Sequence, residues 1–277
     1  MSSPFAPITA VDFHMHSTAS DGDHPPAEMA AASARARLSR WALTDHDSLA
    51  GWHQIQGAPG LVCGVEVTAS ADGREIHIVG LGIDPAHAGF AALLDGIRSM
   101  RMRRIDALLA RLPPEVRRDL TAEQVKPPEA EAVGRLHLAR ALTRSGGVAS
   151  VRDAFDFHLA DEHIADPELP QFPPVEQVTS AIRSAGGVAI LAHPGVYRSI
   201  VVVGPLTDSM DGIEGAHPGL TAELQKDVLE LASMRGLLLS VGSDTHRISA
   251  VRKPGGAMLN PELLAPLMER LRPRPSA

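Results

Sequence analysis

The sequence predicts an α/β fold built on a parallel sheet, with a block of helices inserted near its middle. Short apolar runs alternate with helical segments over residues 11–84 and again over 175–271, which is typical of strand–helix units around a parallel sheet. Between these two stretches we find helical patterns and no convincing strand. The 277 residues suffice for one large barrel or two ordinary domains. We therefore expect a barrel from residues 1–84 and 175–277, and a helical insertion over one face of it from residues 85–174.

The first predicted strand sets the pattern for the others. Val11, Phe13 and Met15 alternate with Asp12, His14 and His16, so one face of the strand is apolar and the two histidines share the other. Two imidazoles on one rigid strand are a ready chelate for a transition metal. Further strands are predicted at residues 41–44, 61–67, 75–83, 188–192, 212–214 and 237–241.

The helices follow from apolar spacing and from their proline and glycine boundaries. The barrel helices are expected at residues 27–39, 175–185, 221–234 and 261–271. In the insertion, residues 90–112 form an amphipathic helix that Pro113 and Pro114 stop. Arg101 lies within its apolar stripe and Arg104 borders the stripe. Two more helices are expected at residues 131–144 and 151–159.

Composition excludes several classes of function. The net charge is −7 and aromatic residues make up 3% of the chain, which argues against a long nucleic-acid footprint or a stacking platform for single strands. The single cysteine, Cys63, excludes an internal disulfide and a thiolate zinc cage. We find no signal peptide and no membrane-spanning stretch. We therefore expect a soluble cytoplasmic protein, with no membrane contact and no protein partner that can be inferred.

Imidazoles and carboxylates recur at or just past the ends of the apolar runs. They are His14 and His16, His46, Glu66, His77, His193, and Asp244 with His246. Asp21 follows the first strand closely and is placed to bend back as an oxygen ligand. In a parallel barrel the carboxyl ends of the strands open on one face, so these groups are expected to converge. Such ligands suit Mn, Zn, Fe or Co. The alternative is a set of ordinary histidines on half-buried strands.

These motifs, taken in order along the chain, resemble those of the PHP (polymerase and histidinol phosphatase) family. The matching segments are His14-Met15-His16, Asp21-Gly22, Thr44-Asp45-His46-Asp47, Gly64-Val65-Glu66, His77, Ala192-His193-Pro194 and Gly242-Ser243-Asp244-Thr245-His246. The resemblance implies a distorted seven-stranded (β/α) barrel with a site for two or three metals. It assigns three ligand sets: His14, His16, Glu66 and Asp244; Glu66, His77 and His193; and Asp21, His46 and His246.

The insertion resembles that of the subgroup acting on nucleoside 3′,5′-bisphosphates, in which it covers the site. This implies a metal-dependent phosphatase that converts adenosine 3′,5′-bisphosphate to AMP and phosphate. Paired ions lower the pKa of a bridging water, and the resulting hydroxide attacks phosphorus. This hydroxide would be held by Glu66, His14, His16, Asp244 and His193. Mn is the expected metal, with Zn, Fe or Mg as alternatives. The alternative functions are a 5′–3′ exoribonuclease on short RNA, a histidinol-phosphate-type phosphatase, and a non-catalytic metal-bearing module.

Five residues are candidates for substrate binding. Arg101 and Arg104 could meet a second phosphate, because guanidinium groups match phosphate oxygens, although for either arginine alone a solvated or ion-paired side chain is slightly favoured. Arg135 and His137 resemble an Arg-Pro-His segment of the family, with Leu136 in place of the proline. His217 could bind phosphate near the metals or simply pack.

Asp45 and Asp47 flank His46, and the sequence supports two roles for them equally. Each could orient a metal-binding imidazole, or each could belong to a plain turn at the end of the strand.

Overall fold

Seven strands form a single sheet in chain order in the computed structural model, which describes residues 10–160 and 168–272. The strands are β1 (Val11–Asp12), β2 (Arg40–Leu43), β3 (Leu61–Ala71), β4 (Arg74–Leu81), β5 (Val188–Leu191), β6 (Gly212–Ala216) and β7 (Leu238–Val241). The sheet curls until its two edges meet, because the Phe13 amide donates to the Val241 carbonyl at 2.9 Å and Met15 pairs with Thr245. The expected seven-stranded barrel is confirmed.

The expectation of a wholly parallel sheet is wrong at one strand. β1, β2 and β3 run parallel, as do β5, β6 and β7, but β4 is antiparallel to both of its neighbours. The reason is local: the two-residue turn Asp72–Gly73, with both residues at positive φ, returns the chain directly from β3 into β4 as a hairpin. His77 therefore lies inside β4 and pairs with Thr68, rather than at the carboxyl end of a parallel strand.

The first strand is shorter than the alternation predicts. Its regular pairing ends at Asp12, because the next backbone groups bond to loops: the Asp244 amide donates to the His14 carbonyl at 2.9 Å, and the His16 amide to the Thr245 carbonyl at 3.1 Å. The alternation of side chains nevertheless persists. Phe13 and Met15 join apolar clusters on one side, and His14 and His16 are fully buried on the other.

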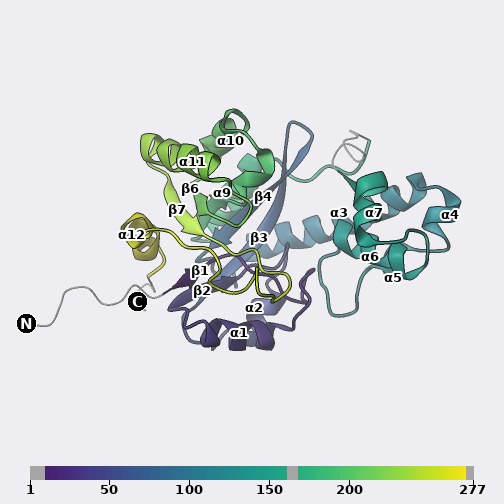
Figure 1. Ribbon diagram of the computed structural model, residues 1–277, viewed down its shortest axis with the longest axis horizontal. Helices are drawn as coiled ribbons and strands as arrows, with labels where there is room; N and C mark the ends of the chain where they lie inside the picture. The colour runs from purple at the N-terminus through teal and green to yellow at the C-terminus, as the bar shows by residue number, and fades with distance from the viewer. Residues whose placement is uncertain (1–9, 161–167, 273–277) are drawn as a thin grey trace, which may run out of the picture.

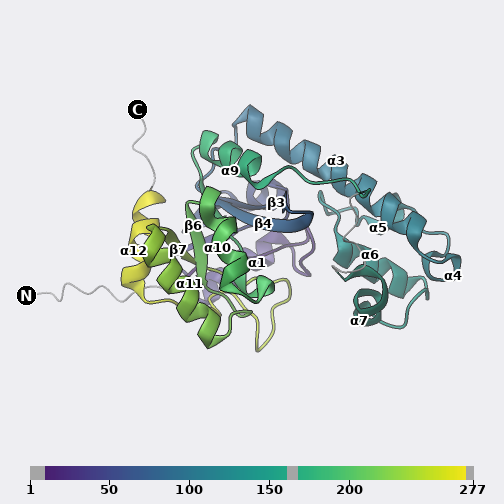
Figure 2. The same cartoon turned by 90° about the horizontal axis from the view of Figure 1, so that it is seen from above.

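Helices cover the outside of the barrel (Figure 2), and the described residues contain no helix both long and apolar enough to cross a bilayer. They are α1 (Pro26–Arg35), α2 (Ala50–Ile55), α9 (Val175–Ser184), α10 (Ile200–Leu206), α11 (Ala222–Arg235) and α12 (Pro261–Arg270). α2 and α10 are too short for their spacing to signal a helix, and the sequence does not predict them. The largest core cluster joins β3, β4 and β5 to α9 and α11, with Ile78, Ile182 and Val228 fully buried.

The inserted helices form a separate lobe beside the barrel (Figure 1). They are α3 (Ala88–Arg111), α4 (Pro114–Arg117), α5 (Ala122–Val125), α6 (Arg135–Arg144) and α7 (Val151–Ala154), followed by a π-helical turn at Phe155–Leu159. The lobe has its own apolar cluster, which includes Leu108, Leu138 and Leu142. α3 spans both parts, since its first half packs into the barrel core through Phe90 and Ile97.

A buried ion pair ties α3 to the barrel. Arg101 is 6% exposed, and its Nε donates to Asp47 Oδ2 at 2.5 Å while its Nη2 donates to Thr68 Oγ1 at 2.5 Å. Its Nη1 donates to the carbonyl of Val133, just before α6. Asp47 also accepts the Thr68 amide at 2.7 Å. The expected substrate residue Arg101 is thus fully engaged within the protein, which points to a structural role for it.

We expect Arg101→Met to lower the free energy of unfolding by about 3–5 kcal/mol, because it leaves the buried Asp47 carboxylate without a counter-ion. Urea unfolding followed by circular dichroism measures the change. Arg103 lies two residues away on α3 with its side chain exposed, so Arg103→Met is the matched control and should stay within about 0.5 kcal/mol of the parent. Equal losses in the two variants would refute this account of Arg101.

Candidate metal centre

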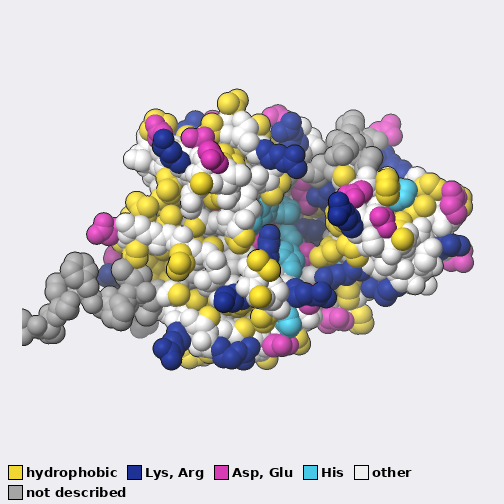
Figure 3. Space-filling view, in the orientation of Figure 1, with side chains coloured by type: hydrophobic (Ala, Val, Ile, Leu, Met, Phe, Trp, Pro, Cys, Tyr) yellow, Lys and Arg dark blue, Asp and Glu magenta, His cyan; other side chains and the backbone are white. Residues whose placement is uncertain are grey.

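One mouth of the barrel, facing the insertion, gathers the nine expected ligands. Figure 3 shows histidine side chains in the hollow between barrel and insertion, bordered by basic residues. They come from the segments that follow β1, β2, β5 and β7 and from the interiors of β3 and β4, and they are His14, His16, Asp21, His46, Glu66, His77, His193, Asp244 and His246. The inversion of β4 brings His77 to this mouth, because the first half of β4 lies beside the second half of β3.

Glu66 lies at the centre of the cluster and is 1% exposed. Its Oε2 lies 3.3 Å from His14 Nε2, 3.2 Å from His16 Nε2 and 3.0 Å from His46 Nδ1. Its Oε1 lies 3.2 Å from His77 Nδ1 and 2.9 Å from His193 Nε2. The two oxygens of a single carboxylate thus face two separate groups of imidazoles.

Asp244 and Asp21 extend the cluster away from Glu66. Asp244 Oδ1 lies 3.4 Å from His16 Nε2 and 3.8 Å from His14 Nε2. Asp21 lies 3.2 Å from His246 Nε2, 3.6 Å from His16 Nδ1 and 3.7 Å from His46 Nε2. The ring of His46 stands between Glu66 and Asp21, so its geometry allows it to serve either ion site.

The donor atoms fit a bound cation better than they fit one another. The ring nitrogens of His14 and His16 face each other at 3.1 Å, as do those of His77 and His193. Two neutral imidazole lone pairs that point together gain nothing without a proton or a cation between them. Within the described residues, the buried Nδ1 atoms of His16 and His193 have no hydrogen-bond partner, and leaving such atoms unpaired is costly. Nitrogen and carboxylate donors of this kind suit borderline divalent metals.

The charges of the cluster keep its carboxylates ionised. Burial alone would raise the pKa of Glu66, but His46, His14 and His77 hold it well below its usual value. Burial likewise opposes charge on His77, yet Glu66 and Glu75 raise the pKa of that imidazole to about 10. Ionised carboxylates are the form that binds a cation, whereas a protonated imidazole must first release its proton.

Two glutamates that the sequence reasoning did not assign to the site orient the imidazoles. Glu214 Oε1 lies 2.8 Å from His14 Nδ1, and its Oε2 accepts the His193 amide. Glu75 Oε1 lies 3.0 Å from His77 Nε2. Such contacts fix the orientation of a metal-binding imidazole. Both had a signal in the sequence: Glu214 ends an apolar run as Glu66 does, and Glu75 shares a strand face with His77.

The backbone at the mouth adopts unusual conformations. His193 and Asp244 have φ of 31° and 50°, in the left-handed region that residues other than glycine rarely adopt. Gly242 has no room for a side chain, because an added Cβ would lie 2.4 Å from both Glu214 Oε1 and His14 Cβ. Strain of this kind persists where the surroundings enforce it, and it clusters at functional sites.

The aspartates beside His46 contact other segments of the chain rather than imidazoles. Asp45 accepts the Ser17 amide at 2.7 Å and the Ser20 hydroxyl at 2.8 Å, which fixes the turn after β1. Asp47 pairs with Arg101 and Thr68. Of the two roles that the sequence left open, a turn agrees with the contacts of Asp45. Asp47 has neither role, because its carboxylate links α3 to β3.

The other expected substrate residues lie around the cluster at different depths. Arg104 donates to the Pro170 carbonyl at 3.1 Å, and its guanidinium carbon lies 5.5 Å from the centre of the Phe172 ring. Arg135 donates to the Leu159 carbonyl, and its Nη2 lies 4.0 Å from Glu75. His137 accepts the Gly134 amide and thereby caps α6, while His217 Nε2 lies 3.4 Å from Asp244 Oδ2.

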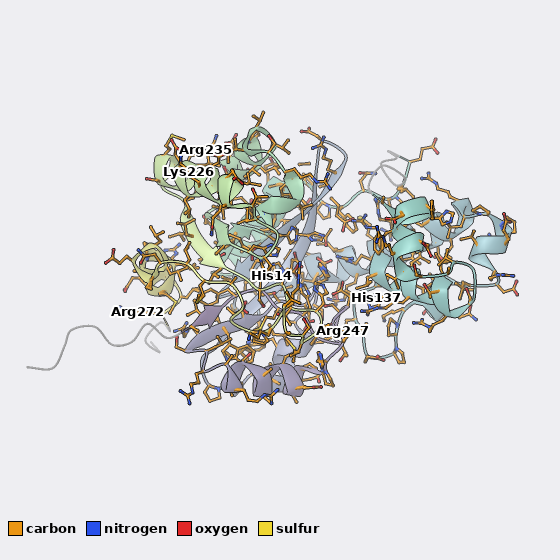
Figure 4. The ribbon with its side chains drawn as sticks, viewed as in Figure 1. His14, His137, Lys226, Arg235, Arg247 and Arg272 are labelled. Atoms are coloured by element: carbon orange, nitrogen blue, oxygen red, sulfur yellow. The ribbon has the colours of Figure 1, made fainter. Side chains whose placement is uncertain are left out.

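A cavity of about 170 Å³ joins the cluster to the insertion. Asp21, His46 and His77 line it from the barrel, and Arg135 and His137 line it from α6. Figure 4 places His14 within the barrel and His137 on the insertion. The structure thus brings Arg101, Arg135 and His137 to the cavity beside the cluster, and it leaves Arg104 outside the residues lining that cavity.

Several known proteins are similar to this chain over most of its length. A 3′,5′-nucleoside bisphosphate phosphatase from Chromobacterium violaceum is 32% identical over 253 residues, covering 85% of this chain and 87% of that protein. A 5′-3′ exoribonuclease from Haemophilus influenzae is 31% identical, covering 85% of this chain and 89% of the relative. A phosphoribosyl 1,2-cyclic phosphate 1,2-diphosphodiesterase from Eggerthella lenta is 29% identical, covering 85% and 93%.

Two solved structures resemble this chain over nearly its whole length. A structure from Bifidobacterium adolescentis, described as a metal-dependent phosphoesterase, is 25% identical with a TM-score of 0.76 and covers 96% of this chain and 98% of its own. A Chromobacterium violaceum structure, described as an amidohydrolase with bound sulfate, is 29% identical with a TM-score of 0.78, covering 94% and 96%. No family model matches the sequence, so the assignment rests on these individual relatives. The chain belongs to the PHP family of metal-dependent phosphoesterases.

Proposed function

We propose that this phosphoesterase removes the 3′-phosphate of nucleoside 3′,5′-bisphosphates, such as adenosine 3′,5′-bisphosphate, releasing a nucleoside 5′-monophosphate. The observation that carries the proposal is the cavity that leads from the cluster to Arg135 and His137. A substrate with two phosphates needs two anion sites, and a guanidinium suits a phosphate that does not react. The relative named as a 3′,5′-nucleoside bisphosphate phosphatase supports the same substrate class.

We propose two or three divalent ions, most simply Mn, in the three ligand sets expected from the sequence. The distances around Glu66, Asp244 and Asp21 support these sets. Bound ions would neutralise the phosphoryl oxygens and lower the pKa of a nearby water, which is what hydrolysis of an anionic ester requires. Glu214 and Glu75 would hold His14 and His77 in position for them.

The insertion, residues 85–174, acts in this proposal as a cap over the mouth. The tie between Arg101 and Asp47 supports a fixed position for it, and the residues of α6 that line the cavity would exclude water from one side of a bound nucleotide. In this proposal His217, whose Nε2 lies 3.4 Å from Asp244 Oδ2, would donate a hydrogen bond to a phosphoryl oxygen beside the cluster.

A 5′–3′ exoribonuclease acting on short RNA is the second candidate, favoured by the relative from Haemophilus influenzae. The same ligand cluster would serve both reactions, since a phosphodiester differs from the monoester only in what one oxygen carries. The net charge of −7 and the small cavity favour the bisphosphate, because a longer strand needs a basic track.

With Mn added, we expect phosphate release from adenosine 3′,5′-bisphosphate to exceed release from histidinol phosphate, and a chelator to abolish both. Phosphate detection on these two substrates, together with chromatography of a short 5′-phosphorylated RNA, measures the preference. Faster trimming of the RNA than of the bisphosphate would establish the second candidate in place of the first.

Replacing the central carboxylate tests the metal sites. A contact that only orients a ligand is worth about 10- to 100-fold, so we expect Glu66→Gln, which removes charge from two ligand sets, to lower kcat/KM at least about 100-fold. Its Mn affinity, measured by calorimetry, should fall in parallel. Glu230 is exposed on α11, and Glu230→Gln serves as the control with both quantities unchanged. Retained Mn binding by Glu66→Gln would contradict the assignment.

Metal binding should release protons. Glu66 and Glu214 raise the pKa of His14 well above its usual value in spite of burial, and the pKa of His77 is raised to about 10. In the metal-free protein these imidazoles therefore hold a proton more tightly than a free imidazole does, and Mn must displace the bound protons. We expect the apparent Mn affinity to rise with pH between 6 and 9. Calorimetry in buffers of different ionisation enthalpy counts the released protons, and a count of zero would oppose the model.

A further inference from the structure

The cavity beside the cluster has a polar part and an apolar wall. The barrel contributes charged and imidazole groups, and the insertion adds Arg101, Arg135 and His137 to them. The apolar wall comes from the insertion alone, from Phe155 and Leu136, both partly exposed, and from Ala132. Phe155 is the sole phenylalanine, tyrosine or tryptophan among the described residues that line this cavity. Phosphates do not require such a wall, because an apolar ring offers them neither charge nor a hydrogen bond.

The ring of Phe155 is held in place by its local structure. It begins the π-helical turn Phe155–Leu159, whose amide-to-carbonyl bond from Ala160 to Phe155 measures 3.0 Å. Turns of this kind are rare, and they are frequent at functional sites. Arg135 donates to the Leu159 carbonyl at the end of the same turn, so its guanidinium is attached to the turn that carries Phe155. Phe155 also packs against the apolar cluster of the insertion.

We propose that Phe155 is the platform on which the substrate's nucleobase stacks. The inference rests on the proposed function, since it supplies the part of the site that would recognise a nucleoside rather than a phosphate alone. With a phosphate at the cluster and Arg135 beside the second one, the base would lie against the apolar wall. Every base has a π-face, so such a platform selects nucleotides over other phosphate esters while tolerating different bases.

The chain offers a matched control two residues away. Phe157 belongs to the same π-helical turn but is 66% exposed and does not line the cavity. Phe155→Leu and Phe157→Leu therefore make the same chemical change in the same turn, and only the first removes an aromatic face from the cavity. Phe155→Tyr keeps the aromatic face and serves as the conservative variant.

The first experiment needs no turnover. Calorimetry on the Mn-loaded protein compares AMP with ribose 5-phosphate, which lacks the base. Stacking on an aromatic side chain is worth about 1–3 kcal/mol, so we expect Phe155→Leu to weaken AMP binding about ten-fold or more. Ribose 5-phosphate should bind equally to parent and variant, Phe155→Tyr should retain AMP affinity, and Phe157→Leu should match the parent with both ligands. Equal weakening of both ligands, or none, overturns the proposal, as does failure of the parent protein to bind AMP.

The second experiment measures turnover of adenosine 3′,5′-bisphosphate and of the same bisphosphate without its base. We expect Phe155→Leu to lower kcat/KM about ten-fold for the nucleotide alone, through KM. An equal fall for both substrates would show that Phe155 only supports the fold. If the parent hydrolyses neither compound, the proposed function fails, while the comparison of AMP with ribose 5-phosphate still decides the role of Phe155.

Discussion

The buried carboxylate of Glu66 is the constraint around which the rest of this molecule is arranged. An ionised carboxylate with 1% of its surface exposed is tolerated only when positive charge or hydrogen bonds compensate it. Here five imidazoles from four segments of the chain supply that compensation. Each imidazole in turn needs a fixed orientation, which Glu214 and Glu75 provide for two of them. The strained backbone at His193 and Asp244 is a further consequence of directing these groups to one point.

Most of the cluster could be predicted from the sequence because its members follow one simple rule, that polar ligands end apolar strands. The barrel and the long helix of the insertion could be predicted because their apolar residues recur at the regular spacing of strands and helices. The inversion of β4 could not, because the apolar pattern of a strand carries no direction. The available signal of this inversion was the hairpin turn at Asp72–Gly73. Recognising that turn would have predicted His77 in the interior of a strand.

Side chains whose role depends on distant partners were the hardest to assign. From its position on a helix, Arg101 is predicted to contact a phosphate. Its guanidinium instead donates hydrogen bonds to Asp47 and Thr68. Nothing in the spacing of α3 reveals that partner, which lies on another segment. Glu214 is the opposite case, because the sequence does not assign it to the site although its carboxylate contacts His14. The two residues are 200 positions apart, so this contact forms only when the barrel closes. Local patterns thus identify which residues are chemically able to act, and topology decides which of them do.

The closing of the sheet between β1 and the loop after β7 has a consequence for biosynthesis. His14 and His16, which lie beside Glu66 Oε2, also lie beside Asp244 Oδ1, and Asp244 follows the last strand. A ribosome must therefore synthesise the chain through Asp244 before these groups can meet, whereas Glu66 and His77 meet early within one hairpin. The cluster is thus completed only after β7 and the loop that follows it have been synthesised.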